Sequence, residues 1–195
     1  EEGEIQIQGP AVFPRYHKNA EATADTFTED GWFMTGDLGR LDEEGFLYIT
    51  GRKKDLIITA GGKNVSPGAM EASVMTSPVV GQCVVVGDRK PFIAAIITLD
   101  LGETNLWLTS QGAEPMPDLQ TAARNPIVRA EVERAVNVAN ELVSRAESIR
   151  KFEIVPDEFT EANGLMTPSM KARRQAVTEH YRDLIDTVIY APAKR

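Results

Sequence analysis

The N-terminal part of the chain shows the alternating pattern of half-buried strands. Polar and apolar residues alternate over positions 4–8, until Gly9-Pro10 ends the pattern with a turn. Two further strands are predicted at 31–41 and 45–50, joined by the turn-forming residues 42–45. These strands are too few to close a β-barrel, so we expect their partners to lie in a segment outside this sequence.

Beyond Lys53 the apolar residues gather into longer, β-branched runs. Residues 79–86 and 92–99 form two such runs, separated by the turn-forming sequence Gly87-Asp88-Arg89-Lys90-Pro91. Apolar, β-branched runs of this length are typical of buried strands, so we predict a strand pair in a covered sheet. A further strand is expected at 149–155.

Capping residues mark the starts of the predicted helices. Serine or asparagine followed by proline is a strong start signal, because the side chain accepts from free backbone N–H groups and proline suits the first turn. Ser66-Pro67 therefore predicts a helix over 67–76. Asn125-Pro126 predicts a helix over 126–147, about 33 Å long at ~1.5 Å per residue. Two more helices are predicted, near 102–111 and from Pro168 to about Val188.

These elements define the expected fold class. Strands and helices intermix from residue 53 to 190, which is the pattern of an α+β domain. A chain of 195 residues can hold one domain of ordinary size plus an attached piece. We therefore predict a small domain with a central sheet flanked by helices, preceded by a few β-strands.

Composition and charge exclude several classes of protein. Hydrophobic residues make up 42% of the chain, yet no apolar run approaches the roughly 20 residues of a membrane-spanning helix. A net charge of -8 argues against a domain that grips nucleic acid with a basic face. The acidic opening residues lack the pattern of a secretory signal, and we expect the first residue to be an internal cut.

Residues that bind metals or form disulfides are scarce. Cys83 is the only cysteine and lies in an apolar run, so a buried, inert thiol in a reducing cytosol is expected. His17 and His180 are the only histidines and lie far apart in the sequence. No histidine-based metal site is therefore predicted.

Three short motifs concentrate residues suited to nucleotide and acyl chemistry. Residues 31–39 read GWFMTGDLG, residues 51–67 read GRKKDLIITAGGKNVSP, and residues 164–174 read GLMTPSMKARR. In this order they resemble the late core motifs of the adenylate-forming superfamily, which includes acyl-CoA synthetases, luciferases and peptide-synthetase adenylation domains. The resemblance covers nearly the whole chain. It is strongest for the AMP-forming long-chain fatty acid–CoA ligases, because of residues 3–10 and the Thr-Pro pair before Lys171.

This resemblance implies a division into two domains. Residues 1–52 would be the C-terminal remnant of a large adenylation domain, with strands from its β-barrel subdomain and the ribose-binding aspartate. Residues 53–195 would be the mobile C-terminal domain. Lys54 falls at the hinge position of the superfamily, where backbone torsions rotate the small domain between two half-reactions.

Asp37 and Arg52 are the candidate nucleotide contacts. A carboxylate can accept from both vicinal hydroxyls of a ribose, and a guanidinium can reach a ribose oxygen or a phosphate. Taken alone, Asp37 is explained as a turn aspartate and Arg52 as surface charge. The resemblance implies the nucleotide role for both, with ATP, AMP and the acyl adenylate as ligands.

The other candidates are Gly61, Gly62 and Lys171. Two adjacent glycines allow close approach of a ligand, although a simple hairpin turn explains them as well. The resemblance implies that they line the pantetheine tunnel for coenzyme A. Lys171 is predicted in the first turn of the last helix, and its alternative is a solvated basic surface. The resemblance makes Lys171 the catalytic lysine of adenylation and suggests Arg173 and Arg174 as secondary contacts to the phosphates of coenzyme A.

The resemblance implies a parent enzyme that converts a fatty acid and ATP to acyl-AMP, and then forms acyl-CoA after domain rotation. The sequence contains no glycine-rich phosphate loop. We therefore expect the missing N-terminal domain to hold the fatty acid, most of the ATP and Mg²⁺, and the fragment alone to be inactive. We also expect a cytoplasmic protein without a nucleic-acid partner or a membrane span, with peripheral membrane association of the parent left open.

Two alternatives stay open at this point. A fatty acyl-AMP ligase would stop at the adenylate and load a carrier protein. A non-catalytic module would keep Asp37 and Arg52 for nucleotide binding or protein interaction alone. Release of AMP that depends on coenzyme A distinguishes the first alternative, and the nucleotide affinity of the isolated chain distinguishes the second.

Overall fold

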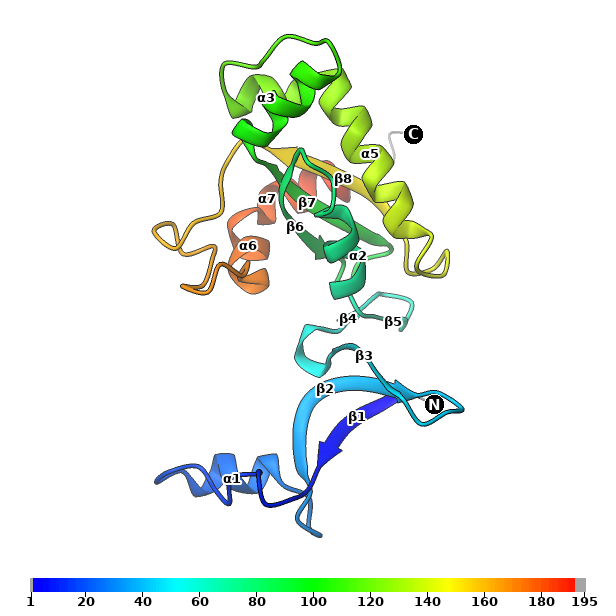
Figure 1. Ribbon diagram of the computed structural model, residues 1–195, viewed down its shortest axis with the longest axis vertical. Helices are drawn as coiled ribbons and strands as arrows, with labels where there is room; N and C mark the ends of the chain where they lie inside the picture. Colours follow the sequence, from blue (N-terminus) through cyan, green and yellow to red (C-terminus); the bar gives the residue numbers. More distant parts are fainter. Residues whose placement is uncertain (1, 192–195) are drawn as a thin grey trace. The chain divides into compact units, whose positions relative to one another are not determined.

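The computed structural model describes residues 2–191, which form two compact units. Unit 1 extends to Leu56, and unit 2 begins at Ile57. Unit 1 holds a small sheet and a short helix, whereas unit 2 holds further strands with helices around them (Figure 1). The α+β class predicted from the sequence is confirmed.

Unit 1 is built on an antiparallel sheet in the order β1-β2-β3. Its strands confirm the three that alternation and turn residues predict, and they are β1 (Glu2–Ile7), β2 (Phe33–Leu41) and β3 (Leu47–Arg52). In the β2–β3 turn, the Asp42 carboxylate accepts the backbone N–H groups of Phe46 at 2.8 Å and Glu44 at 3.0 Å. The bond from Phe46 is the main reason that the pKa of the Asp42 carboxyl is lowered. This turn helps to fix the register in which Asp37 faces Arg52.

The segment between β1 and β2 contains a helix that the pattern of apolar residues does not predict. This helix, α1 (Ala20–Thr26), begins where the Asn19 side chain accepts the backbone N–H of Ala22 at 3.0 Å. Four aromatic rings pack beside it, from Phe13, Tyr16, Phe27 and Phe33. Edge-to-face contacts among these rings join the loop after β1 to the first residue of β2.

Unit 2 is organised around a sheet in the order β6-β7-β8. β6 (Val80–Val86) pairs antiparallel with β7 (Ile93–Leu99), and β8 (Ile149–Val155) lies parallel to β7. Neighbours along a strand face opposite sides, so Val85 joins one buried cluster and Val84 joins another. The predicted strand pair in a covered sheet is therefore confirmed, and the structure covers this sheet on both faces.

Helices supply the second half of each cluster. α2 (Gly68–Val74) and α5 (Pro126–Asn140) pack on the face that carries Val85, through residues such as Met70 and Val132. α6 (Arg174–His180) and the π-helical η2 (Ile185–Ile189) pack on the opposite face, through residues such as Val177. The remaining elements are the 3₁₀ turn η1 (Lys53–Asp55), β4 (Ile57–Ile58), β5 (Asn64–Val65), α3 (Leu101–Ser110), α4 (Leu119–Arg124) and α7 (Arg182–Leu184).

α5 starts as predicted but is shorter than its apolar pattern suggests. It ends at Asn140 and does not continue to residue 147. The Asn140 side chain donates to the carbonyl of Ile149 at 3.0 Å and accepts the N–H of Ile149 at 2.7 Å. These bonds fix the end of α5 to the first residue of β8. Leu142 continues the apolar pattern in the sequence, but it is 60% exposed.

The prediction that the last helix begins at Pro168 is wrong. The N–H of Thr167 donates to the Lys171 carbonyl at 2.8 Å, and the N–H of Lys171 donates to Thr167 Oγ1 at 3.1 Å. Residues 167–171 therefore close a turn on themselves, and α6 begins only at Arg174. Beyond α6 the chain continues as two separate helical segments, α7 and η2, instead of one regular helix.

The two predicted Ser/Asn-Pro caps have different outcomes. The Asn125 side chain accepts the N–H groups of Ile127 at 2.8 Å and Val128 at 3.3 Å, which confirms it as the cap of α5. Ser66 does not cap α2, which begins at Gly68. Within the described residues, the buried Ser66 hydroxyl has no hydrogen-bond partner.

We predict that Asn125→Ala lowers the free energy of unfolding of unit 2 by about 1 kcal/mol, because two backbone donors of α5 lose their acceptor. Urea unfolding followed by the fluorescence of Trp107, with Trp32 replaced by Phe, measures this loss. Asn137→Ala is the matched control, because it makes the same change at a solvent-exposed position in the middle of α5. Alanine favours the helix at such a position. Equal destabilisation by both substitutions would contradict the capping role.

Candidate functional site

The structure brings Asp37 and Arg52 together. They are directly opposed in the β2–β3 register, and Arg52 Nε donates to Asp37 Oδ1 at 2.9 Å. The Arg52 side chain is 62% exposed and the Asp37 side chain 29% exposed, so solvent reaches both members of the pair. Gly36, with φ +73°, makes the bend before Asp37. The pair places an acceptor and several donors side by side, as binding of a polar sugar or phosphate requires.

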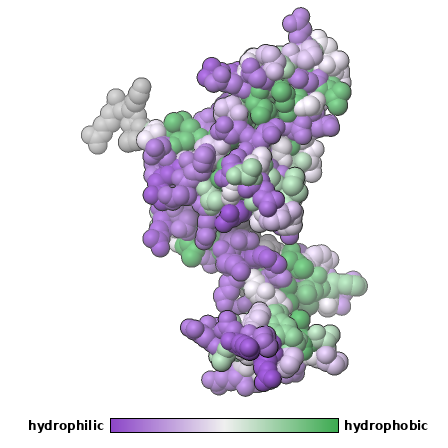
Figure 2. All heavy atoms as spheres, turned by 90° about the vertical axis from the view of Figure 1, so that its left-hand side faces the viewer, coloured by the Kyte–Doolittle hydropathy of each residue, from purple (hydrophilic) through white to green (hydrophobic). Residues whose placement is uncertain are grey.

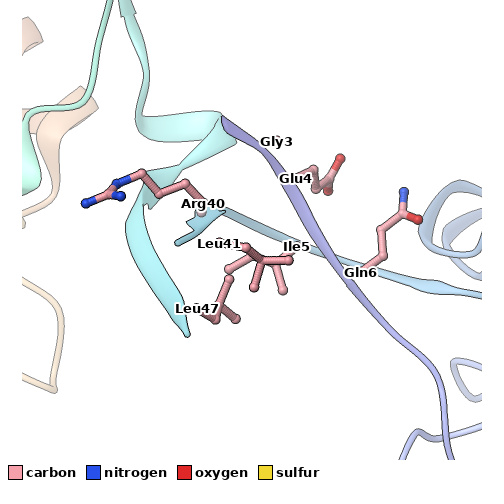
Figure 3. Close-up of a pocket in the computed structure, with 8 residues that line it drawn as sticks. Gly3, Glu4, Ile5, Gln6, Arg40, Leu41 and Leu47 are labelled. Atoms are coloured by element: carbon pink, nitrogen blue, oxygen red, sulfur yellow. The ribbon is translucent and has the colours of Figure 1, made fainter. Parts of the chain in front are cut away.

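Glu4 is a supporting residue that the sequence gives no signal for. Its Oε1 accepts the N–H of Gly36 at 3.1 Å, and its Oε2 accepts from Lys53 Nζ at 2.8 Å. Glu4 and Gln6 point to one side of β1, whereas Ile5 points to the other (Figure 3). The carboxylate of Glu4 therefore connects the bend before Asp37 to the residue that follows Arg52.

The opposite side of this sheet is an apolar hollow of about 500 Å³. Ile5, Leu41 and Leu47 gather in it (Figure 3), and Leu41 and Leu47 are 63% and 51% exposed. Phe46, Tyr48 and Ile49 are also exposed on the same hairpin. Apolar side chains form patches on the face of the molecule drawn in Figure 2. Solvated apolar positions in regular strands indicate a surface that normally packs against other protein.

Lys54 lies in the 3₁₀ turn η1, near the C-terminal end of unit 1. Lys53 is held by Glu4 in unit 1, and Ile57, at 3% exposure, is buried in unit 2. Between them, Lys54 and Asp55 are exposed, and neither side chain forms a hydrogen bond or ion pair with the described residues. The side-chain anchors therefore stop immediately before Lys54.

Gly61 and Gly62 form the tip of the turn between β4 and β5. Gly62 has φ +77°, and a Cβ atom added to it would meet nothing within 4 Å. The base of the turn is firm, because the N–H of Thr59 donates to the Lys63 carbonyl at 3.0 Å. Lys63 also pairs with Glu147 at 3.2 Å. The glycines thus present bare backbone on a fixed turn.

Lys171 lies in the loop between β8 and α6, in the closed turn 167–171. Its side chain is exposed, and its ammonium group contacts no hydrogen-bond acceptor within residues 2–191. The preceding residue, Met170, has φ +61° and is 74% exposed. A non-glycine residue in this conformation is strained by about 1 kcal/mol or more, and such strain gathers at functional sites.

Of the two arginines after Lys171, only Arg173 stays available to a ligand. One Nη atom of Arg173 donates to the Gly164 carbonyl at 3.2 Å, and the side chain is otherwise exposed. Arg174 is taken up by bonds inside unit 2, to Glu71 on α2 and to the carbonyl of Val85. A contact of Arg174 with a coenzyme A phosphate would therefore have to compete with these bonds, and it stays a prediction.

Other reactive groups of the described chain do not form a site. No three His, Cys, Asp or Glu side chains of the described residues are grouped so that they could hold a metal ion. No helix within residues 2–191 is long and apolar enough to cross a membrane. Cys83 is buried, and this burial is the main reason that the pKa of its thiol is raised.

We predict that Cys83 does not react with Ellman's reagent in the folded chain at pH 8, because burial blocks access and disfavours the thiolate. Absorbance at 412 nm, recorded with and without 8 M urea, measures the reaction. The thiol should react rapidly only in urea. A native rate equal to the rate in urea would contradict the burial of Cys83.

The chain is similar to known proteins in both sequence and fold. The family model described as the AMP-binding enzyme C-terminal domain matches residues 54–193. The long-chain-fatty-acid–CoA ligase FadD15 of Mycobacterium tuberculosis is 47% identical over 188 residues, which cover 96% of this chain and 31% of the relative. The long-chain-fatty-acid–CoA ligase ACSBG2 of Gallus gallus is 36% identical and is matched over 98% of this chain and 27% of its own length.

Solved structures give the same assignment of fold. The adenylation domain of a carboxylate reductase from Mycobacterium chelonae has a TM-score of 0.76 at 27% identity, and the match covers 98% of this chain and 28% of that chain. An adenylation and carrier didomain of a carboxylic acid reductase from Segniliparus rugosus, in complex with AMP, has a TM-score of 0.73 at 26% identity, with 97% and 25% coverage. The chain thus spans less than a third of the length of these relatives.

Proposed function

This chain belongs to the AMP-binding enzyme C-terminal domain family, and we propose that it is the C-terminal part of an ATP-dependent long-chain fatty acid–CoA ligase. The observation that carries the proposal is the exposed ammonium of Lys171, which lies on a closed turn of that domain and has no partner among residues 2–191. The names of the curated relatives support the substrate class. Unit 1 is then the remnant of the large domain, and its exposed apolar hairpin packs against the rest of that domain.

In the first half-reaction, a carboxylate oxygen of the fatty acid attacks the α-phosphorus of ATP. The new bond is the acyl–phosphate bond, and the bond between the α-phosphorus and the bridging oxygen breaks to release pyrophosphate. Lys171 delivers its ammonium to the carboxylate and the α-phosphate, where it offsets the negative charge that develops. Asp37 accepts hydrogen bonds from the ribose hydroxyls. Arg52 gives up part of its hydrogen bonding to Asp37 and donates to the nucleotide instead.

In the second half-reaction, the thiol sulfur of coenzyme A attacks the acyl carbonyl, and AMP leaves. Lys171 has to withdraw, and the bare backbone at Gly61 and Gly62 forms a wall of the thiol passage. Rotation about the backbone torsions of Lys54 replaces the Lys171 loop at the active site with the Gly61-Gly62 turn. Lys54 can serve as the pivot because the last side chain held by an ion pair before it is that of Lys53. We assign Mg²⁺ to the triphosphate in the large domain, and no step here uses it.

Lys171→Ala in the full-length enzyme should lower the rate of acyl-AMP formation about 10²-fold or more, because the developing charge loses its partner. Transfer from supplied acyl-AMP to coenzyme A should stay within about twofold. Pyrophosphate–ATP exchange and thioester release measure the two steps. Arg124→Ala removes an exposed cation of α4 and serves as the control. Equal loss in both steps would sink the assignment of Lys171.

Lys54→Pro should impair thioester formation and spare adenylation, because proline fixes one backbone torsion at the pivot. Lys54→Ala is the matched control, since it removes the same side chain and leaves the torsions free. The same two assays separate the outcomes. Unchanged thioester formation in the proline variant would show that the rotation occurs elsewhere.

The comparison with an adenylation and carrier didomain favours one second candidate, in which the acyl group passes to a carrier protein and not to coenzyme A. Release of AMP that requires coenzyme A supports the ligase, whereas release that requires a phosphopantetheinylated carrier supports the alternative. Tight binding of AMP to the isolated chain would instead support a nucleotide-binding module. A cytoplasmic location fits substrates such as ATP and coenzyme A, and it stays a prediction.

A further inference from the structure

Glu71 on α2 and Arg174 on α6 form an ion pair within unit 2. Arg174 Nη1 donates to Glu71 Oε1 at 2.6 Å, and Arg174 Nη2 donates to Glu71 Oε2 at 2.8 Å. The two side chains are 25% and 14% exposed. A two-pronged contact of this kind fixes the guanidinium plane as well as its position.

Both residues are also bonded to Val85 on the outer strand of the sheet. The N–H of Val85 donates to Glu71 Oε1 at 2.7 Å, and the Val85 carbonyl accepts from Arg174 Nη1 at 2.6 Å. β6 is the edge strand, so these backbone groups have no neighbouring strand to pair with. The Glu71–Arg174 pair therefore supplies the hydrogen bonds that a neighbouring strand would otherwise make to Val85. In doing so it connects α2, β6 and α6.

Arg174 is the first residue of α6 and lies three residues after Lys171. The loop before it is anchored at its start, where Leu165 and Met166 are 3% and 4% exposed. At its end, the N–H of Arg173 donates to the Leu165 carbonyl at 2.8 Å, and Arg174 is then fixed to Glu71 and Val85. Without Arg174, the end of the loop nearest to Lys171 loses its charged anchor.

We propose that Arg174, held by Glu71, is a positioning residue for Lys171 in the first half-reaction. Arg174 acts through the backbone that follows Lys171 and touches no substrate. This inference rests on the proposed function, since it needs Lys171 to act in adenylation. The buried Nε of Arg174 has no hydrogen-bond partner within the described residues, so the hydrogen bonds that orient this side chain go to Glu71 and Val85.

The test uses Arg174→Ala in the full-length enzyme, with palmitate as the fatty acid. We expect acyl-AMP formation to fall about tenfold to a hundredfold, as displacement of a catalytic group by about 1 Å can cause, while transfer from supplied acyl-AMP stays within about twofold. Glu71→Gln should give a smaller loss with the same selectivity, because it keeps an acceptor for Val85. Arg174→Lys should recover part of the activity of the alanine variant.

Arg134→Ala is the matched control. Arg134 makes the same two-pronged contact with a buried carboxylate, Glu131, but on α5 and away from the Lys171 loop in sequence. Its loss should lower the melting temperature without separating the two half-reactions. If Arg174→Ala does not fold, Glu71→Gln and Arg174→Lys decide the question by the same ratio of half-reaction rates.

Unchanged adenylation in the folded Arg174 and Glu71 variants, or equal loss of both steps, would overturn the positioning role. The Lys171→Ala enzyme keeps this result separate from the proposed function. If Lys171→Ala loses adenylation and Arg174→Ala does not, only the positioning role fails. If Lys171→Ala retains adenylation, both the proposed function and the positioning role fail.

Discussion

The burial of one three-stranded sheet on both faces is the constraint on which unit 2 depends. Neighbouring residues of β6 and β7 belong to different apolar clusters. A shift of either strand by one residue would therefore move every side chain of that strand to the opposite face and disrupt both clusters. α2, which follows the glycine turn, packs on one face, and α6, which follows the Lys171 loop, packs on the other. Two loops far apart in the sequence are thereby carried by one packed body.

Two sets of charged side chains in this protein have different roles. Glu71 with Arg174, Glu4 with Lys53, and Lys63 with Glu147 are ion pairs between segments distant in the sequence, and they hold loop bases in place. Lys54 and Lys171 lie next to such anchored positions but are themselves exposed and unpaired within the described residues. An exposed ammonium on a firm support can meet an anion with little loss of conformational entropy.

The sequence predicts those features whose causes are local. The β-branched runs of β6 and β7 have to be strands, and the Asn125 cap needs only the next few residues. The end of α5 depends on Ile149, nine residues beyond Asn140, and so the apolar pattern alone places it too late. Thr167 and Pro168 are a sound helix signal, but the hydroxyl of Thr167 is used to close the turn at Lys171. Glu4 and Glu71 have partners 14 to 103 residues away, which no local pattern reveals.

We propose that unit 2 moves as one rigid lobe that presents the Lys171 loop and the glycine turn in alternation. Spin labels at positions 43 and 114 of the full-length enzyme report the distance between the two units, and labels at 114 and 161 report a distance inside unit 2. Pulsed electron paramagnetic resonance measures both distances with a non-hydrolysable acyl-AMP analogue, which represents the adenylation state. The measurement is repeated after coenzyme A is added, which represents the thioester-forming state. We expect the 43–114 distance to change and the 114–161 distance to stay the same. An unchanged 43–114 distance, or a change confined to 114–161, would contradict the rotating rigid lobe.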